Sequence, residues 1–176
     1  MKIFSTKFKG LKIIKLKKFK DLRGEVVKIF NKENSKINFN FSESYISISK
    51  KGAIRGLHGQ IGKDSQSKII FCVQGKFLDI AVDLRKNSKT YKKVFTKTIN
   101  SKNSSILVIP EGFAHGIISL EDKTTLVNFN SKKYKPKKEF GININSLNLS
   151  LPKIRFYQSN KDKKLPKLNE FLKENK

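Results

Sequence analysis

The fold is constrained most by a series of short segments in which apolar and polar residues alternate, each bounded by turn residues. The clearest segment has Leu78, Ile80, Val82 and Leu84 on one face and Phe77, Asp79, Ala81 and Asp83 on the other. Alternation of this kind is typical of a β-strand. Two carboxylates share a face with a phenylalanine, so that face either lines a cavity or is a solvated outer face, and the pattern leaves both open.

Similar segments recur along the chain at the interval typical of an all-β sandwich or barrel. They are predicted at Leu11–Lys17, Glu25–Phe30, Phe39–Ser49, Ile54–Gln60, Lys68–Gln74, Tyr91–Ile99, Ser105–Ile109, His115–Leu120 and Thr124–Asn130. Polar or glycine-containing turns separate them, at 21–24, 31–38, 50–52 and 61–67 among others. Only Pro166–Glu174 has helical periodicity. The sequence therefore predicts an all-β fold with a short C-terminal helix.

The length of 176 residues fits one domain covering 1–176, and no repeat or linker divides it. The charge is extreme, because 39 Lys+Arg stand against 14 Asp+Glu and give a formal net charge of +25. Such an excess first indicates nucleic acid or an anionic surface as partner. The lysines, however, are spread over every segment instead of gathering in a tail or one basic helix, which argues against nucleic acid. The positive field would still attract a small phosphorylated substrate.

Cys72 is the single cysteine, which excludes an intrachain disulfide, and its apolar strand predicts an inert, buried thiol. No signal peptide is recognisable, because the first residues run into lysines before an apolar region forms. The longest apolar runs, such as Ile106–Pro110, are far too short to cross a bilayer. We therefore expect a reduced, cytoplasmic protein that has no membrane partner.

The chain contains two histidines, and the first lies in Ile54-Arg55-Gly56-Leu57-His58-Gly59-Gln60. Arginine is always charged, and histidine can take or give a proton near neutral pH. Together they suit a site where a proton moves while negative charge develops nearby. The glycines allow a ligand or another strand to approach closely. The alternative is that Arg55 is a surface cation and His58 a core histidine with satisfied hydrogen bonds.

The second histidine, His115, lies in a segment from Ile109 to Gly116 whose proline and glycines form a turn at a strand start. Paired histidines in a β-barrel first suggest a metal site. Such sites need about three histidines and a carboxylate in close spacing. This chain has two histidines far apart in sequence, so we predict that it binds no metal.

A series of longer motifs follows in order along the chain. They are Asp21-Leu22-Arg23-Gly24, Arg55-Gly56-Leu57-His58, Lys68 before an apolar strand, residues 79–88, residues 109–116, and Tyr134-Lys135-Pro136 with Gly141-Ile142. Together they resemble the dTDP-4-dehydrorhamnose 3,5-epimerase family, from Leu11 to Asp162. The resemblance implies a cupin-type jelly-roll β-sandwich, a site without metal or other cofactor, a homodimer, and a nucleotide-linked 4-keto-6-deoxy sugar as substrate.

The resemblance also implies roles for individual residues. His58 matches the base that removes a proton beside the ketone, and Asp162 matches the carboxylate that orients this base. Arg55 and Lys68 match cations near the ketone oxygen, where they would stabilise an enolate.

Three further residues match binding positions of the family. Arg23 matches a contact to the diphosphate, for which a guanidinium fork is suited. His115 matches a second histidine of the pocket, and Tyr134 matches a tyrosine close to the family's general acid.

The sequence departs from the family at the general acid itself. Asn128 stands where the family has a tyrosine, and an amide has no useful acidic proton. Gly59 replaces a residue that is often aromatic, which predicts a roomier pocket beside the base. Glu43-Ser44-Tyr45 replaces amide side chains, and Tyr45 is expected to face the pocket. Proton removal is therefore predicted to be intact, whereas reprotonation is altered.

Several activities are compatible with this departure. The first is epimerisation at two carbons or at one carbon of a 4-keto sugar. The second is a sugar-nucleotide ketoisomerase, and the third is a cupin-type protein that binds a sugar nucleotide without catalysis. Retention of His58 and Asp162 favours an enzyme, namely a cofactor-independent isomerase.

Overall fold

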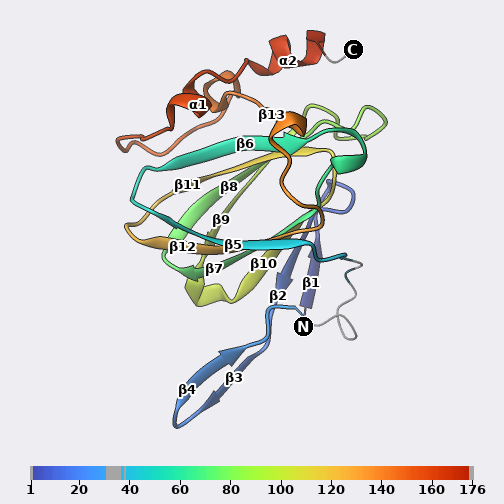
Figure 1. Cartoon of the computed structure of the whole chain (residues 1–176). Coiled ribbons are helices and arrows are strands. Elements are labelled where there is room, and N and C mark those ends of the chain that lie inside the picture. The colour runs from blue at the N-terminus through green and yellow to red at the C-terminus, as the bar shows by residue number, and fades with distance from the viewer. Residues whose placement is uncertain (1, 31–36, 38, 175–176) are drawn as a thin grey trace.

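The strands form two antiparallel sheets packed face to face in a computed structural model that describes residues 2–30, 37 and 39–174 (Figure 1). The six-stranded sheet has the order β1-β2-β10-β7-β12-β5, with bounds Lys2–Ser5, Lys12–Lys15, Ser105–Ile109, Lys68–Gln74, Thr124–Asn130 and Glu43–Ser49. The five-stranded sheet has the order β13-β6-β11-β8-β9, with bounds Glu139–Gly141, Ile54–Gln60, Phe113–Ser119, Lys76–Asp83 and Val94–Asn100.

The remaining elements are short. A hairpin is formed by β3 (Lys18–Asp21) and β4 (Gly24–Val27), and the C-terminal region contains α1 (Asn160–Lys163) and α2 (Leu168–Glu174). Single turns of 3-10 helix lie in connections at Gly62–Asp64, Ser101–Asn103, Pro136–Lys138 and Ile144–Ser146. None of the helices in the described ranges is long and apolar enough to cross a membrane.

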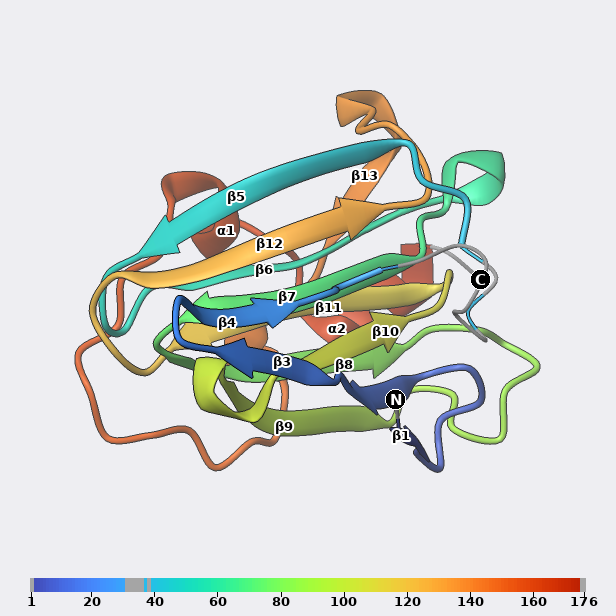
Figure 2. The same ribbon diagram turned by 90° about the horizontal axis from the view of Figure 1, so that it is seen from below.

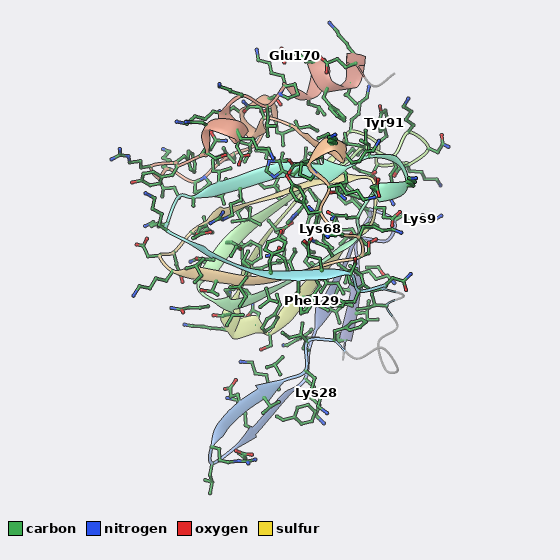
Figure 3. The ribbon with its side chains drawn as sticks, in the orientation of Figure 1. Lys9, Lys28, Lys68, Tyr91, Phe129 and Glu170 are labelled. Carbon is green, nitrogen blue, oxygen red and sulfur yellow. The ribbon has the colours of Figure 1, made fainter. Side chains whose placement is uncertain are left out.

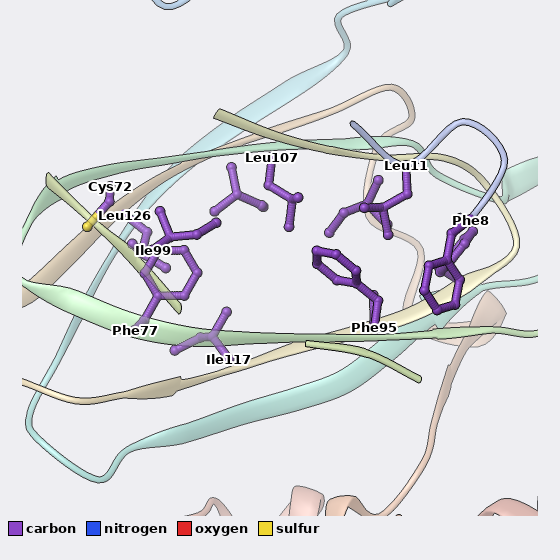
Figure 4. Close-up of a cluster of buried hydrophobic side chains, with 13 residues drawn as sticks. Phe8, Leu11, Cys72, Phe77, Phe95, Ile99, Leu107, Ile117 and Leu126 are labelled. Atoms are coloured by element: carbon purple, nitrogen blue, oxygen red, sulfur yellow. The ribbon is translucent and has the colours of Figure 1, made fainter. Parts of the chain in front are cut away.

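The main core lies between the two sheets (Figure 4). The five-stranded sheet contributes side chains such as Phe77 and Ile117, and the six-stranded sheet contributes Leu107 and Leu126, all at most 5% exposed. Full burial of such a side chain contributes about 1.5–3 kcal/mol to folding. Cys72 belongs to this core, and burial raises the pKa of its thiol to about 12, as expected for inert packing.

Both sheets are also covered on their outer faces over much of their area. The chain after β13 packs Ile142, Ile144 and Phe171 over the outer face of the five-stranded sheet. Ile37 and Phe39 belong to the corresponding cluster on the six-stranded sheet. Covering layers of this kind explain why strands such as β7 and β10 are apolar on both faces.

The two faces of β8 have different surroundings. Leu78 and its alternating partners belong to the outer cluster, whereas Phe77, Asp79 and Asp83 point into the sandwich and are fully buried. Asp83 is saturated there by Arg85 and by two hydroxyl groups, and these bonds lower its carboxyl pKa to about 2 although burial raises it. The face with the carboxylates is therefore interior, and the solvated alternative is wrong.

The predicted strands agree best in the centre of the sheets. The predicted bounds of β7, β10 and β12 match the structure, and the predicted C-terminal helix is α2. Prediction missed β1, β3 and β13, and it began β5 too early, at Phe39 instead of Glu43. The expected loop at 31–38 lies, apart from Ile37, outside the described residues.

The β3–β4 hairpin stands away from the sandwich in Figure 1, and in Figure 2, which is seen from below, it lies in front of the sheets. Asp21 pairs with Gly24, so Leu22 and Arg23 form the two-residue tip in the turn that the sequence predicted. Phe19, Leu22 and Val26 are exposed apolar residues of this hairpin.

Candidate active site

The sandwich is hollow at one end, where edge strand β5 faces β6. A cavity of about 660 Å³ lies there, and its lining includes the predicted residues Tyr45, Arg55, His58, Lys68, His115, Asn128 and Asp162. A second cavity of about 370 Å³ shares Tyr45, His58 and Lys68 with the first and is also lined by Tyr134. The structure therefore brings together every candidate residue except Arg23.

A β-bulge in β6 turns Arg55 and His58 toward the same cavity. In a regular strand, residues three apart point to opposite faces. His58 pairs with His115 and Arg55 with Ile117, so three steps along β6 oppose two along β11. Gly56 lies in the bulge at φ +101°, and a Cβ there would be 2.6 Å from the His115 carbonyl oxygen. Only glycine permits this close approach.

Asp162 orients the imidazole of His58. The Asp162 Oδ1 atom lies 2.8 Å from His58 Nε2, and Oδ2 accepts the backbone N–H of Gly56 at 3.2 Å. Asp162 is itself fixed in α1, where its backbone N–H donates to Ser159 Oγ at 3.0 Å. Because a carboxylate only accepts hydrogen bonds, Nε2 carries the proton and Nδ1 presents its lone pair.

The surroundings of His58 keep it neutral and therefore basic at pH 7. Burial lowers the pKa of His58, the nearby carboxylates of Asp162 and Glu139 raise it, and the net result is a pKa below the ordinary value of histidine. Its side chain is 26% exposed, so the ring can still be reached from the cavity. A neutral imidazole with a fixed tautomer is suited to accept a proton.

His115 forms a second histidine–carboxylate pair deeper in the sandwich. His115 lies opposite His58 on β11, and its Nε2 is 2.7 Å from Asp79 Oδ2. The side chains of His115 and Asp79 are 8% and 0% exposed. The other oxygen of Asp79, Oδ1, is buried and has no hydrogen-bond partner among the described residues.

Lys68 supplies a cation between the two cavities. Figure 3 shows it between the sheets, and its Nζ donates to the His58 carbonyl oxygen at 3.4 Å. Burial lowers the pKa of Lys68 to about 8, while Glu139 and Asp79 oppose this effect. The ammonium is thus charged at neutral pH and has N–H groups left for a ligand.

Arg55 is held at the rim of the first cavity by the opposite sheet. Its Nε donates to Ser49 Oγ at 2.9 Å and its Nη2 donates to the Ile48 carbonyl oxygen at 3.1 Å, both on β5. The guanidinium is thereby fixed beside the space that a ligand would occupy.

Glu139 is a site residue that sequence reasoning missed. Its Oε1 lies 3.8 Å from His58 Nδ1, and its Oε2 accepts hydrogen bonds from Tyr134 at 3.0 Å and from Lys161. Burial raises the pKa of Glu139, but Lys161 and His58 lower it below its ordinary value. Glu139 lies between the Tyr134-Lys135-Pro136 and Gly141-Ile142 motifs, and this position in the sequence could have indicated that it belongs to the site.

One expectation, for Gly59, is wrong, and another, the diphosphate contact of Arg23, is not tested by a single copy of the chain. Arg23 lies at the hairpin tip, its side chain is 90% exposed and its guanidinium pairs with Asp21 at 2.7 Å, so it does not line either cavity of its own chain. Gly59 does not make the pocket roomier, because a Cβ there would lie 2.4 Å from the ring of Phe140. Phe140 fills that space and stacks on Phe171.

Potential metal ligands do not converge. Across 2–30, 37 and 39–174, no group of three or more His, Cys, Asp or Glu side chains could hold a metal ion. Each imidazole Nε2 instead faces its own carboxylate.

Comparison with known proteins agrees with this geometry. The family model described as dTDP-4-dehydrorhamnose 3,5-epimerase matches residues 5–170. A Shigella flexneri protein with the same name is 34% identical over 92% of this chain and 93% of its own. A solved structure of that name from Sulfolobus tokodaii is 36% identical, covers 94% of this chain and 97% of its own, and has a TM-score of 0.86.

A further solved structure contains a ligand. It is dTDP-6-deoxy-D-glucose-3,5-epimerase from Legionella pneumophila in complex with dTDP-4-keto-L-rhamnose, 30% identical, with a TM-score of 0.88 over 96% of this chain and 93% of its own. The expected cupin-type sandwich is thus confirmed. On these grounds the chain belongs to the dTDP-4-dehydrorhamnose 3,5-epimerase family and is an isomerase.

Proposed function

We propose that this protein is an epimerase of a nucleotide-linked 4-keto-6-deoxy sugar in which His58 removes a proton from a carbon beside the ketone. The observation that carries the proposal is the His58–Asp162 contact of 2.8 Å, which uses Nε2 and leaves the Nδ1 lone pair, 3.8 Å from Glu139 Oε1, to accept a proton in a cavity that Lys68 also lines. The known ligand of the Legionella relative is a sugar of this class.

The chemistry follows from the charges in the cavity. Hydrogens beside a ketone are acidic because the electron pair that remains can move onto the carbonyl oxygen. His58 Nδ1 takes the proton and becomes an imidazolium between Asp162 and Glu139. Lys68 and Arg55 stabilise the enolate oxygen, and groups that stabilise an oxyanion each contribute about 100- to 1,000-fold to a rate.

The proposed substrate carries a diphosphate, and the proposed location is the cytoplasm. The net charge of +25 favours approach of a diphosphate group. The single cysteine is a free, buried thiol, and we place the protein in the reducing cytoplasm.

We further propose that one carbon is inverted, not two. Asn128 lines the cavity at the position of the expected acid tyrosine, and its amide cannot supply a proton to a second carbon. This restriction distinguishes the chain from relatives named as 3,5-epimerases.

The test is incubation of the protein with dTDP-4-keto-6-deoxyglucose in deuterated water, followed by mass spectrometry and NMR. Deuterium at one carbon with inversion there is the expected result. Label and inversion at two carbons would refute the one-centre proposal, movement of the ketone would indicate a ketoisomerase, and no exchange despite binding would indicate a non-catalytic protein.

We also propose a homodimer in which Arg23 of one copy reaches the cavity of its partner. Arg23 is held on a projecting hairpin with exposed Phe19 and Leu22. Ile46 and Ile48 on the edge strand β5 are 65% and 64% exposed, so a second copy could cover apolar surface there. The hairpin then supplies the diphosphate contact that its own cavity lacks.

Complementation tests this arrangement. Arg23→Ala and His58→Ala proteins are mixed, unfolded and refolded together, and assayed at low substrate concentration. If Arg23 of one copy completes the cavity of the other, about a quarter of all sites should be intact. Half of the dimers are then mixed, and each mixed dimer has one intact site. Contact within one copy predicts no recovery, and a monomer in light scattering would also refute the proposal.

A further inference from the structure

Tyr45 and Asn128 are direct neighbours across two strands. They are paired residues of β5 and β12, so their side chains leave the six-stranded sheet on the same face. Both line the cavity that contains His58. The phenol that Asn128 lacks is therefore present one strand away, about 5 Å to the side.

Tyr45 is also the phenol best placed for inversion. His58 belongs to the five-stranded sheet, and Tyr45 belongs to the sheet on the opposite side of the cavity. A ligand between the sheets would thus have the base on one face and this phenol on the other. Inversion requires this arrangement, since the proton must return from the side opposite to its removal.

The other three tyrosines are less suitable. Tyr91 lines neither cavity. Tyr134 donates its hydroxyl hydrogen to Glu139 at 3.0 Å. Tyr157 pairs with Ala53 at the start of β6, on the side of His58, and the Lys50 ammonium lies 3.7 Å from the centre of its ring.

The surroundings of Tyr45 keep its proton available. Burial and the charge of Glu43 raise the pKa of the phenol, while the nearby Asn130 amide and the charge of Arg55 oppose this. The phenol therefore stays protonated at neutral pH.

We propose that Tyr45 is the proton donor for the inverted carbon, an inference that rests on the proposed function. His58 Nδ1 forms an N–H bond as the C–H bond breaks, and the electron pair moves into the enolate. The enolate carbon then forms a C–H bond to the Tyr45 proton, which leaves a phenolate. The imidazolium gives its proton to water and the phenolate takes one from water, so both groups return to their starting states.

The experiment separates proton removal from inversion. Tyr45→Phe is incubated with dTDP-4-keto-6-deoxyglucose in deuterated water, exchange is followed by mass spectrometry, and configuration by NMR. We expect exchange within about threefold of the unaltered protein, because His58 is untouched, but inversion slower by about 100-fold or more. In Tyr45→Phe, deuterium should therefore enter at this carbon with retention of its configuration. The double variant that carries both Tyr45→Phe and Asn128→Tyr should invert at least about tenfold faster than Tyr45→Phe alone.

Matched tyrosine variants provide the controls. Tyr91→Phe should leave both rates unchanged, and circular dichroism checks the fold of every variant. Inversion at the unaltered rate in Tyr45→Phe overturns the inference, as does selective loss of inversion in Tyr134→Phe instead. Absence of exchange in the unaltered protein overturns the proposed function itself, which is a different result from any loss confined to inversion.

Discussion

The two histidine–carboxylate pairs have nearly the same geometry and opposite surroundings. Nitrogen–oxygen distances are 2.8 Å for His58–Asp162 and 2.7 Å for His115–Asp79. His58 is 26% exposed and receives its carboxylate from a helix 104 residues later. His115 is 8% exposed and receives its carboxylate from the neighbouring strand β8.

This difference shows that the environment, not the contact distance, decides what such a pair can do. A partly open pair can exchange a proton with a ligand. A closed pair chiefly satisfies buried polar groups, and removing one partner leaves a buried group uncompensated. The following predictions test this distinction, beginning with the largest effect.

Replacing each histidine by alanine should give different losses. His58→Ala should lower deuterium exchange by about 100- to 10,000-fold, the usual contribution of a general base. It should change the free energy of unfolding by less than about 1 kcal/mol, within the range of partly exposed sites. His115→Ala should lower the free energy of unfolding by about 3 kcal/mol, because Asp79 loses its partner in the interior. Urea titration and exchange rates, measured at one protein concentration, check both. Equal stability losses would contradict the comparison.

Replacing each carboxylate by its amide sharpens the same contrast. Asp162→Asn should lower exchange on the order of 10- to 100-fold, because it disturbs the tautomer of His58 without removing the base. Asp79→Asn should lower exchange by a smaller factor, since His115 does not take the proton. A larger loss in Asp79→Asn would reverse the assignment of the two pairs.

The pH dependence of exchange should be bell-shaped. The pKa of His58 lies below the ordinary value of histidine, so the neutral base is lost only as pH falls through that lowered pKa. The pKa of Lys68 is about 8, so its charge and the enolate stabilisation are lost as pH rises through that range. Rate profiles of the unaltered protein and of Lys68→Arg check this. Arginine stays charged, so the alkaline decline should disappear, and a decline that persists would contradict the role of Lys68.

The smallest expected effect is that of a chelator. His58 Nε2 contacts Asp162 and His115 Nε2 contacts Asp79, so each imidazole has a different carboxylate partner. Exhaustive chelation should therefore leave the exchange rate within about twofold, since histidine metal sites need more converging ligands than these. Loss of activity that is restored by a divalent cation would refute the metal-free prediction.

Local pattern predicted the central strands well and the edges poorly. Runs such as Ile69 to Cys72 are apolar, rich in β-branched residues and bounded by turn signals, so they fold as read. Strand β3 was missed because three of its four residues are charged, and it is stabilised by pairing with β4 rather than by burial. Strand β13 was missed because it has only three residues.

The site could be predicted only in part for a related reason. Arg55 and His58 are near neighbours in sequence, but their pairing with Asp162 depends on packing over more than 100 residues, and local spacing carries no such information. Here the resemblance supplied the partner. Glu139 stands among lysines, where an isolated carboxylate reads as a surface charge.

The extra residue in β6 makes strand length part of the proposed catalytic site. Deleting one residue between Arg55 and His58 would restore strict alternation and would direct the two side chains to opposite sides of the sheet. Such a deletion would remove no functional group, yet the imidazole would lose the cavity. Among relatives, the number of residues between this arginine and histidine is therefore as informative as their identity. We expect a relative with an alignment gap at this point to lack the proton transfer proposed for His58.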